Sequence, residues 1–593
     1  MPVRKPYSGL VRKLVIAFDI GTTYSGASYA VLDPGLPPII EGVTKFPAQG
    51  KAGGDSKIPS VIYYDRNGQV QAIGAEAIQD SFIEKAEEEE YTAVEWFKLH
   101  LRPKGLEKSQ IQDSHIPPLP PKKRAIDVYA DFLRYLHQCT ITFIKQGRGA
   151  DFFLSVEHNI DYILTHPNGW EGVQQGLMRQ AAIRAGLVSA VDAHSRLQFV
   201  TEGEASLHYC ISKGVLRDTD MVLDKGFIIV DAGGGTIDLS AYKRTPSGVF
   251  QEIARTQCRL QGSIYVTRWA TEWLMERLKN SKYNTPQDIT RMAKEFDKVA
   301  KLVFRDETEM GYIQFGSLRD KDLSVGITRG VLKIPGENMK SFFTHSVREI
   351  LGAIDEQVKE ADTPISAVYL VGGFAASDYL FSTLEKDLEK RKLSSSRPDG
   401  FVNKAVTDGA ISFYLDRMVS ARVARFTYGL ECSTAFNPHD PDHKERSHTV
   451  FTSAAGDQRL AGKFDVILYR GTRVSEETEF RRSYEQVAAT ADSLRNLSVE
   501  LLHYKGHDDA PIWIDIEPKR FPALCTIEAD TPNNLIDTGY DMRKGRSYHR
   551  CKFDVVLLLG LTELKAQISW KVNGVENRSP ATVVYDRSET HHS

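Results

Sequence analysis

Residues 14–26 have the sequence LVIAFDIGTTYSG, and this stretch decides the fold. Its first five residues, Leu14 to Phe18, are all apolar, which is typical of a buried strand. The strand gives way to Asp19-Ile20-Gly21-Thr22-Thr23, where glycine and small polar residues predict a turn. A second strand is predicted in residues 27–32, ASYAVL, so the segment is a hairpin with polar residues at its turn.

The same pattern recurs much later in the chain. Residues 227–242, FIIVDAGGGTIDLSAY, contain an apolar strand, a glycine-rich turn from Asp231 to Asp238 and a second strand. Two similar hairpins this far apart predict a duplicated core, with one hairpin in each of two lobes.

The remaining sequence predicts helices first and strands later. Residues 128–144 carry apolar side chains at helical spacing, and a helix is predicted from Ala405 towards Met418. After about Arg425 the pattern alternates as in strands, and Asn573-Gly574 is a strong hairpin signal. We therefore expect a flexible tail (1–13), a first lobe (14–220), a second lobe (221–418), a linker (419–426) and a β-rich domain (427–593).

Composition excludes several classes of protein. The chain has 593 residues and a formal net charge of -3, so we expect several domains and no nucleic-acid partner. No apolar run reaches the ~20 residues that span a bilayer, and residues 1–13 lack the apolar core of a secretion signal. The 6 cysteines show no CxxC spacing, which disfavours a zinc site. We expect a cytoplasmic protein with reduced thiols.

Both hairpin turns combine glycine, threonine and aspartate, which together suit a nucleoside triphosphate and its metal. Glycine lets several backbone N–H groups point at one phosphate, and threonine hydroxyls add donors. Asp19, Asp231 and Asp238 would repel a bare phosphate, so they indicate a cation such as Mg²⁺, whose waters they can hold. Two such loops facing each other would hold the phosphates from both sides. The alternative for either loop alone is an ordinary tight turn.

Other phosphate-binding and hydrolytic motifs are missing. The sequence lacks GxxxxGK[ST], HExxH, GxSxG and the protein-kinase set, which removes the commonest rivals. A third element, residues 367–373 (AVYLVGG), is an apolar strand that ends in Gly372-Gly373. Such an ending suits a close approach of the backbone to a flat base or a ribose.

At this point the residues resemble the nucleotide-binding region of the seventy-kilodalton heat-shock proteins, over roughly residues 14–418. Residues 19–25 are similar to the first phosphate motif of that family, residues 231–238 to its second, and residues 371–373 to its adenosine motif. The resemblance implies an α/β fold: a two-lobed actin-like (ribonuclease H-like) ATPase domain with a duplicated core, followed here by a β-rich C-terminal domain. It also implies that ATP or ADP binds with Mg²⁺.

The resemblance assigns roles to individual residues. Lys98 and Glu202 match the lysine and the glutamate near the attacking water, whereas Pro167 and Arg179 match a proline–arginine relay. For Lys98 the alternative is a solvated helix lysine. The predicted site residues are Lys98, Glu202, Asp19 and Asp231 for catalysis; Gly21, Thr22, Thr23, Tyr24, Gly233, Gly234, Gly235, Thr236, Gly372, Gly373, Glu295 and Lys298, with Lys301 nearby, for the nucleotide; Asp19, Asp231 and Asp238 for the metal; and Pro167 and Arg179 for the relay.

The sequence also departs from the family pattern. Gly203 and Glu204 follow Glu202, where the family has proline and threonine. The arginine that the family places against adenine is missing after Gly373, and residues 414–426 carry arginines in place of an acidic, apolar linker. No helical lid is evident at the C-terminus. These departures resemble the divergent subfamily A member twelve branch and its fungal relatives.

Three classes of function remain open. They are an ATP-driven chaperone acting on unfolded or specific protein clients, a nucleotide-dependent scaffold or sensor with little turnover, and a small-molecule kinase of the same fold. The two loops cannot separate these classes, because a fold does not fix a function. The segments around Pro167, Arg179 and Glu202 disfavour the kinase. We therefore expect a slow Mg-dependent ATPase with a chaperone-like role.

Overall fold

The computed structural model of the chain describes residues 4–51, 56–103, 116–170, 172–219, 222–398, 405–475, 478–541, 545–559, 563–580 and 582–583. It divides the chain into two compact units. The first unit holds residues 1–170 and 177–419, and the second holds residues 171–176 and 420–593. Among the helices within the described ranges, none combines the length and the apolar character that crossing a membrane requires.

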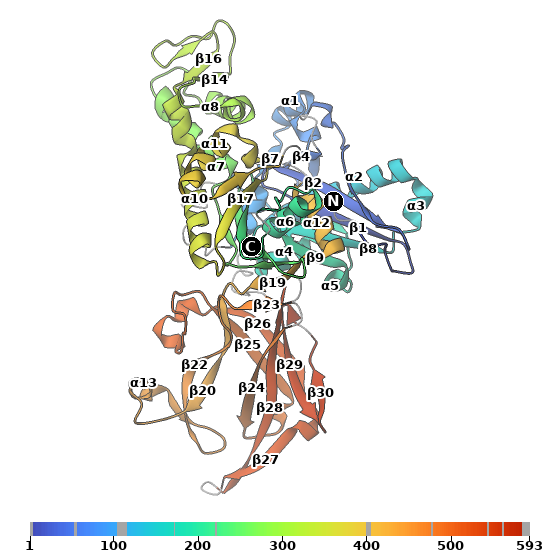
Figure 1. The fold of residues 1–593 in the computed structure, drawn as a ribbon, viewed down its shortest axis with the longest axis vertical. Helices are drawn as coiled ribbons and strands as arrows, with labels where there is room; N and C mark the ends of the chain where they lie inside the picture. The colour runs from blue at the N-terminus through green and yellow to red at the C-terminus, as the bar shows by residue number, and fades with distance from the viewer. Residues whose placement is uncertain are drawn as a thin grey trace. The chain divides into compact units, whose positions relative to one another are not determined.

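Two sheets of the first unit contain the two predicted hairpins (Figure 1). The first sheet has the strand order β3-β2-β1-β8-β9, and the second contains the order β18-β17-β10-β11-β12. Their strands are β1 (Lys13–Ile20), β2 (Tyr24–Leu32), β3 (Ile39–Gly42), β4 (Lys57–Pro59), β8 (Ile160–His166) and β9 (Leu197–Thr201), then β10 (Gly226–Ala232), β11 (Ile237–Arg244), β12 (Phe250–Glu252), β13 (Gln257–Arg259), β17 (Ile365–Val371) and β18 (Ser394–Ser396).

The two sheets share one arrangement of strands. In each, the first strand of a hairpin (β1 or β10) pairs antiparallel with the next strand and parallel with a distant one (β8 or β17). Both faces of β1 and β10 are buried, which explains their continuous apolar sequences. The arrangement makes this an α/β unit with several sheets, whereas its division into two lobes with a duplicated core stays a prediction.

Strand direction places the polar turn residues together. Asp19 and Asp231 each lie one residue before the end of their strand, β1 and β10. Because β8 runs parallel to β1, and β17 runs parallel to β10, the carboxyl ends of neighbouring strands meet at one edge of each sheet. Ligands of parallel sheets bind outside this edge.

Helices and smaller sheets complete the first unit, to which α4 belongs from residue 177 onwards. Its main helices include α2, where the apolar spacing of residues 128–144 predicted a helix, and α12, which begins at the predicted Ala405. The bounds are α1 (Asp80–Glu88), α2 (Ala125–Arg148), α3 (Ala150–Leu154), α4 (Val173–Ala185), α5 (Ala193–Arg196), α6 (Glu202–Ser212), α7 (Ser263–Leu278), α8 (Pro286–Glu295), α9 (Lys301–Val303), α10 (Gly336–Glu360), α11 (Asp378–Lys390) and α12 (Ala405–Asp416), with β5 (Val61–Tyr64), β6 (Val70–Ile73), β7 (Thr92–Glu95), β14 (Gly311–Gln314), β15 (Ile327–Thr328) and β16 (Val331–Ile334).

Two segments differ from the expected tail and linker. The expected flexible tail is bound to the first unit from residue 4 onwards: Arg4 forms an ion pair with Asp416 at 3.0 Å, and the Tyr7 N–H donates to the Leu36 carbonyl at 2.9 Å. A specific ion pair and a backbone hydrogen bond hold this segment, which composition alone could not show. Most of the expected linker forms β19 (Val419–Val423), a strand that pairs with β23 (Arg473–Ser475).

The second unit is rich in strands, as the alternating sequence predicted. One sheet has the order β21-β22-β20-β25-β26, and the other has β24-β28-β29-β30 with β27 and β31 attached. Both sheets contribute to one apolar core. The bounds are β20 (Thr427–Ala435), α13 (Pro441–Glu445), β21 (Val450–Thr452), β22 (Gln458–Leu468), β24 (Glu479–Ala488), β25 (Asn496–Tyr504), β26 (Ala523–Asp530), β27 (Ile536–Asp541), β28 (Arg546–Leu559), β29 (Leu564–Val572), β30 (Val575–Arg578) and β31 (Thr582–Val583).

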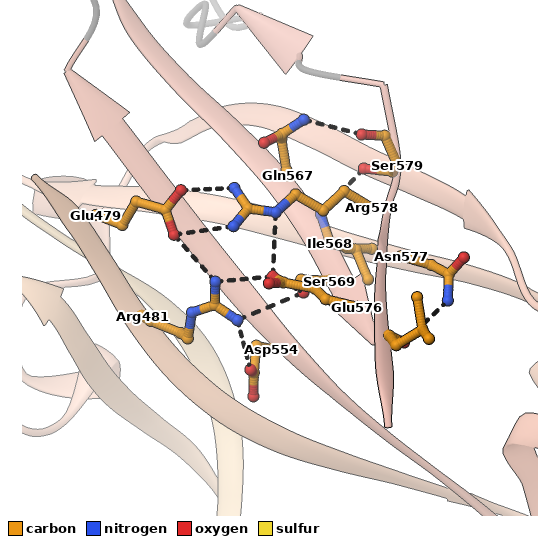
Figure 2. Close-up of polar contacts among 11 residues, drawn as sticks. Glu479, Arg481, Asp554, Gln567, Ile568, Ser569, Glu576, Asn577, Arg578 and Ser579 are labelled. Atoms are coloured by element: carbon orange, nitrogen blue, oxygen red, sulfur yellow. Dashed lines mark hydrogen bonds and ion pairs between the residues drawn. The ribbon is translucent and has the colours of Figure 1, made fainter. Parts of the chain in front are cut away.

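The outer face of the second sheet carries a network of charged side chains (Figure 2). Arg481 on β24 pairs with Glu576 on β30 at 2.8 Å, and Arg578 on β30 pairs with Glu479 on β24 at 2.6 Å. Hydrogen bonds from the Ser569 hydroxyl and the two arginines lower the pKa of Glu576 to about 2. Exposed pairs of this kind contribute little each, so the apolar inner face supplies most of the stability of this sheet.

His137, on α2 in the first unit, predicts acid sensitivity. It lies against Phe18 and Tyr162, and burial lowers its pKa to about 4. Below pH ~6.5 the unfolded chain binds a proton at this position that the folded chain does not bind, so stability falls as pH falls from 6.5 towards 4. We expect His137→Phe to remove up to about 3 kcal/mol of this loss. Urea unfolding of the wild type and of His137→Phe, at pH 7 and pH 4.5, measures the loss of stability in each protein. An equal loss in the two proteins would contradict the prediction.

Candidate functional site

The two glycine–threonine turns face each other inside the first unit. A Cβ atom added at Gly234 would lie 2.3 Å from Thr23 Oγ1, and one added at Gly235 would lie 2.4 Å from Thr22 Oγ1. Real Cβ atoms do not approach other atoms so closely, so the turn after β10 packs directly against the turn after β1. The structure therefore brings together the two loops that the sequence placed far apart.

The N-terminus of α7 supports the second loop from behind. The backbone N–H groups of Ser263 and Ile264 donate to the carbonyls of Gly233 and Gly234, at 3.1 and 3.0 Å. These two bonds engage carbonyl oxygens of the loop and not its N–H groups. Gly233 N–H donates back to the Thr236 carbonyl at 2.9 Å, which closes the hairpin turn.

Asp19 lies between two cationic side chains. Lys57 Nζ on β4 is 2.6 Å from Asp19 Oδ2, and the Thr165 hydroxyl donates to Asp19 Oδ1 at 2.9 Å. Burial acts to raise the pKa of Asp19, but the positive charges of Lys57 and Lys98 outweigh burial and hold the pKa below its usual value. Asp19 is therefore a charged carboxylate with a hydrogen-bond partner at each oxygen.

At Asp231 and Asp238 the effect of burial outweighs that of the neighbouring cations. The Ser206 hydroxyl donates to Asp231 Oδ2 at 2.6 Å, yet burial, with the nearby charge of Glu202, raises the pKa of Asp231 to about 7. Burial and Glu202 likewise raise the pKa of Asp238 well above its usual value. Among the described residues, Asp238 Oδ2 is buried without a hydrogen-bond partner of normal geometry. Buried carboxylates with raised pKa values and an open acceptor favour a positively charged ligand.

The donor set fits a cation that keeps several of its waters. In the parts of the chain that the structure describes, no group of three His, Cys, Asp or Glu side chains is close enough to hold a metal ion. Carboxylates that reach a metal through its waters need no such cluster, and Mg²⁺ keeps several of its waters in proteins. The raised pKa values of Asp231 and Asp238 indicate where positive charge would be stabilised.

Lys98 and Glu202 form a buried ion pair. Their Nζ and Oε1 atoms are 2.6 Å apart, and the Lys98 side chain is only 3% exposed, so it is not a solvated helix lysine. Burial acts to lower the pKa of Lys98, but Glu202 and Asp19 outweigh it and raise the pKa above its usual value. Trp96, with φ of 56°, turns the chain from β7 into the short 3-10 helix Phe97–Leu101 that carries Lys98.

Gly372 is required by packing inside the protein. Its φ is +90°, and a Cβ atom there would lie 2.3 Å from Asp231 Oδ1 and 2.5 Å from the Ala232 carbonyl oxygen. This close approach of β17 to β10 explains the glycine without a base or a ribose. Gly373 follows with an ordinary helical φ of -64°, and Tyr24, the first residue of β2, is 53% exposed.

The predicted base-contacting segment lies where α8 ends. Glu295 is the last residue of α8, and Lys298 is an exposed residue of the π-helical turn Phe296–Ala300. Lys301 is 5% exposed, and its Nζ donates to the hydroxyls of Ser263 at 3.0 Å and Thr267 at 3.2 Å on α7. Lys301 is therefore tied to the helix that supports the second loop, whereas Lys298 points to solvent.

The relay candidates have distinct surroundings. Arg179 on α4 is 4% exposed, donates to the Leu197 carbonyl at 3.2 Å and lies 4.9 Å from the centre of the Phe199 ring. The carbonyl of Pro167 accepts from the Trp170 N–H at 3.0 Å. Arg179 thus braces β9, the strand that leads to Glu202, and a relay through Pro167 stays a prediction.

Sequence reasoning missed several residues of the site. Lys57, Thr165, Asn168 and Ser206 each contact one of the three aspartates. Lysine, threonine, asparagine and serine are common on any surface, so no local pattern marks these positions. Thr165 and Asn168 could have been suspected, because they flank His166-Pro167 at the carboxyl end of β8.

Comparison with known proteins places the chain near one group of heat shock proteins. It is 22% identical to mouse heat shock 70 kDa protein 12A, over 72% of this chain and 73% of the relative. It is 21% identical to human heat shock 70 kDa protein 12A, over 70% of this chain and 72% of the relative. It is 22% identical to human heat shock 70 kDa protein 12B, over 72% and 73% respectively. No protein-family model matches the chain.

The chain is a distant relative of heat shock 70 kDa proteins 12A and 12B. The relationship supports the twelve-like branch that the residues resembled, and the observed α/β unit with several sheets is consistent with a heat shock 70 kDa type of fold. These relatives come from mouse and human, and the fungal affinity stays a prediction.

Proposed function

We propose that the chain binds Mg–ATP between the turns at residues 19–25 and 231–238 and hydrolyses it slowly to ADP and phosphate. The observation that carries this proposal is the direct packing of Gly234 and Gly235 against Thr23 and Thr22. Opposed backbone N–H groups and hydroxyls suit a polyphosphate. The distant relationship to heat shock 70 kDa proteins supports the same ligand.

The residues of the two turns would act in two ways: the aspartates would hold a cation, and the hydroxyl and N–H groups would orient the phosphates. Asp19, Asp231 and Asp238 would hold the waters of a bound cation, which would supply positive charge next to the phosphates. Thr22, Thr23 and the N–H groups of residues 234–236 hold the phosphates. The water oxygen forms a bond to the γ-phosphorus while the bond from that phosphorus to the bridging oxygen breaks, which leaves ADP with the bridging oxygen and dihydrogen phosphate with both water protons.

Lys98 and Glu202 serve the attacking water. The 2.6 Å ion pair fixes the lysine ammonium within the site, where its charge stabilises negative charge that develops on the phosphate. Glu202 orients Lys98, and its carboxylate accepts a hydrogen bond from the water.

Calorimetry with ATP, ADP and Mg²⁺ tests binding, and release of phosphate tests turnover. We expect ATP to bind only with Mg²⁺, and turnover to be well below ~1 s⁻¹, slower than typical enzymes. An ATPase rate that rises with unfolded peptide supports the chaperone-like role. Binding without turnover leaves the scaffold or sensor, and mass spectrometry of a metabolite mixture after reaction would expose a phosphorylated acceptor. No binding of either nucleotide would contradict the proposal.

A cytoplasmic location is part of this proposal, and fractionation of cells tests it.

A further inference from the structure

Asn168 is a fully buried asparagine that links the first sheet to the second. It follows Pro167 just after β8, and its side chain is 0% exposed. Its Nδ2 donates to the Leu239 carbonyl and to Ser240 Oγ on β11, both at 3.0 Å, and to the Gln257 carbonyl on β13 at 3.3 Å. A residue at the end of a first-sheet strand is thus bonded to two strands of the second sheet.

Two further bonds connect Asn168 to groups of the proposed site. Its backbone N–H donates to Asp238 Oδ1 at 2.7 Å, and its Oδ1 accepts from the Gly203 N–H at 3.3 Å. Gly203 is the residue after Glu202 and lies in the first turn of α6. The neighbours fix the orientation of the amide, because two carbonyl oxygens can only accept and a backbone N–H can only donate.

Gly203 is adapted to this contact. A Cβ atom there would lie 2.6 Å from Ser240 Oγ and 2.9 Å from both Asn168 Oδ1 and Nδ2. Any larger residue would push the asparagine away, and a proline would also lack the N–H that Asn168 accepts. Gly203, after Glu202, and Asn168, after Pro167, are therefore matched to each other in size and in hydrogen bonding.

We propose that Asn168 is a positioning residue that holds the Glu202 carboxylate and the Asp238 carboxylate in a fixed relation across the two sheets. This inference rests on the proposed function and deepens it. Glu202 and Lys98 serve the water, and Asp238 serves the cation. The groups that serve the water and the group that serves the cation must be correctly spaced, and Asn168 sets that spacing: its side chain bonds Gly203 at the start of α6 and the strands β11 and β13, while its backbone N–H bonds Asp238. A misplacement of ~1 Å in such a constellation lowers rates by ~100-fold.

Asn168→Ala is the first test. We expect kcat for ATP to fall by ~10-fold or more, while the affinity for Mg–ADP changes by less than ~3-fold, because the phosphate turns keep their contacts. Gly203→Ala should give the same split. The double variant should be little worse than either single variant, because both break the same contact. Asn159→Ala is the matched control: Asn159 also donates to a carbonyl, that of Arg12 at 2.8 Å, but before β8 begins.

Asn168→Asp separates hydrogen bonding from space filling. Aspartate has the same shape, but it replaces the Nδ2 donor by an acceptor that faces other acceptors, and it adds charge beside Asp238. We expect kcat to be lower for Asn168→Asp than for Asn168→Ala. The opposite order, or equal kcat for Asn168→Ala and Asn159→Ala, would overturn the proposal, as would a parallel loss of kcat and Mg–ADP affinity.

Hydrogen exchange tests the contact between Asn168 and Gly203 in the absence of nucleotide. We expect the N-terminal turn of α6, including Gly203 N–H, to exchange at least ~10-fold faster in Asn168→Ala than in the wild type. Equal protection of this turn in the two proteins would overturn the proposal that Asn168 holds Gly203. Failure of the proposed function looks different, because the wild type itself would then bind no Mg–ATP while this exchange comparison still decides whether Asn168 holds Gly203.

Discussion

Replacement of Gly234 by valine is expected to lower the affinity for Mg–ATP by at least ~100-fold, about 2.7 kcal/mol. The Cβ of the new side chain would fall 2.3 Å from Thr23 Oγ1, so the two turns must move apart. Backbone N–H groups that are proposed to converge on one phosphate then diverge. Calorimetry with ATP and Mg²⁺ on both proteins measures the change.

The control for this variant is Gly352→Val. Gly352 lies within α10, and a Cβ atom there meets nothing within 4 Å. We expect this variant to bind Mg–ATP as the wild type does. Overpacking at Gly234 also costs about 1–3 kcal/mol of stability, so the binding comparison is made well below the unfolding temperature of each protein. Equal affinity for wild type and Gly234→Val would remove the phosphate-turn assignment.

Lys98→Met is expected to abolish detectable turnover and to destabilise the first unit by about 3–5 kcal/mol. Methionine has a similar length, so the loss of stability comes from the Glu202 carboxylate, which stays buried without its partner at 2.6 Å. Turnover falls by ~100-fold or more, because the charge that faces the developing phosphate charge is removed.

A double-mutant cycle separates these two effects. Glu202→Gln combined with Lys98→Met removes both charges, so we expect most of the lost stability to return while turnover stays absent. Lys279→Met breaks the exposed pair with Glu276, whose side chains are 58% and 73% exposed, and should change stability by less than ~1 kcal/mol. Urea unfolding, followed for the first unit, gives the free energies. A double variant as unstable as Lys98→Met would contradict the buried pair as the cause.

Local sequence predicted those parts of the structure that depend on neighbours along the chain. Apolar strands interrupted by glycine-rich turns predicted β1 with β2 and β10 with β11, because hairpins form between adjacent segments. Asn573-Gly574 predicted the turn between β29 and β30, where both residues have positive φ. The three aspartates and the threonines were recognised because their types are unusual together at strand ends.

The contacts between distant segments could not be predicted in this way. Lys57 and Asp19 are 38 positions apart, and Asn168 and Asp238 are 70 apart. Sequence spacing does not state which sheets pack together. Lys301 is buried against α7, whereas Lys298 is exposed, and local sequence did not show this difference either. It follows from the π-helical turn, which changes the face of the helix on which each lysine lies.

The sequence by itself determined the two hairpins, β1 with β2 and β10 with β11, and the residues at their turns that can carry charge to a phosphate. Only the tertiary structure decided that Gly234 packs on Thr23, that Lys98 is buried against Glu202, and that Asn168 joins the two sheets. The physical reason is that a turn is fixed by φ and ψ of adjacent residues, whereas burial of a polar group is favourable only when another segment supplies its partner.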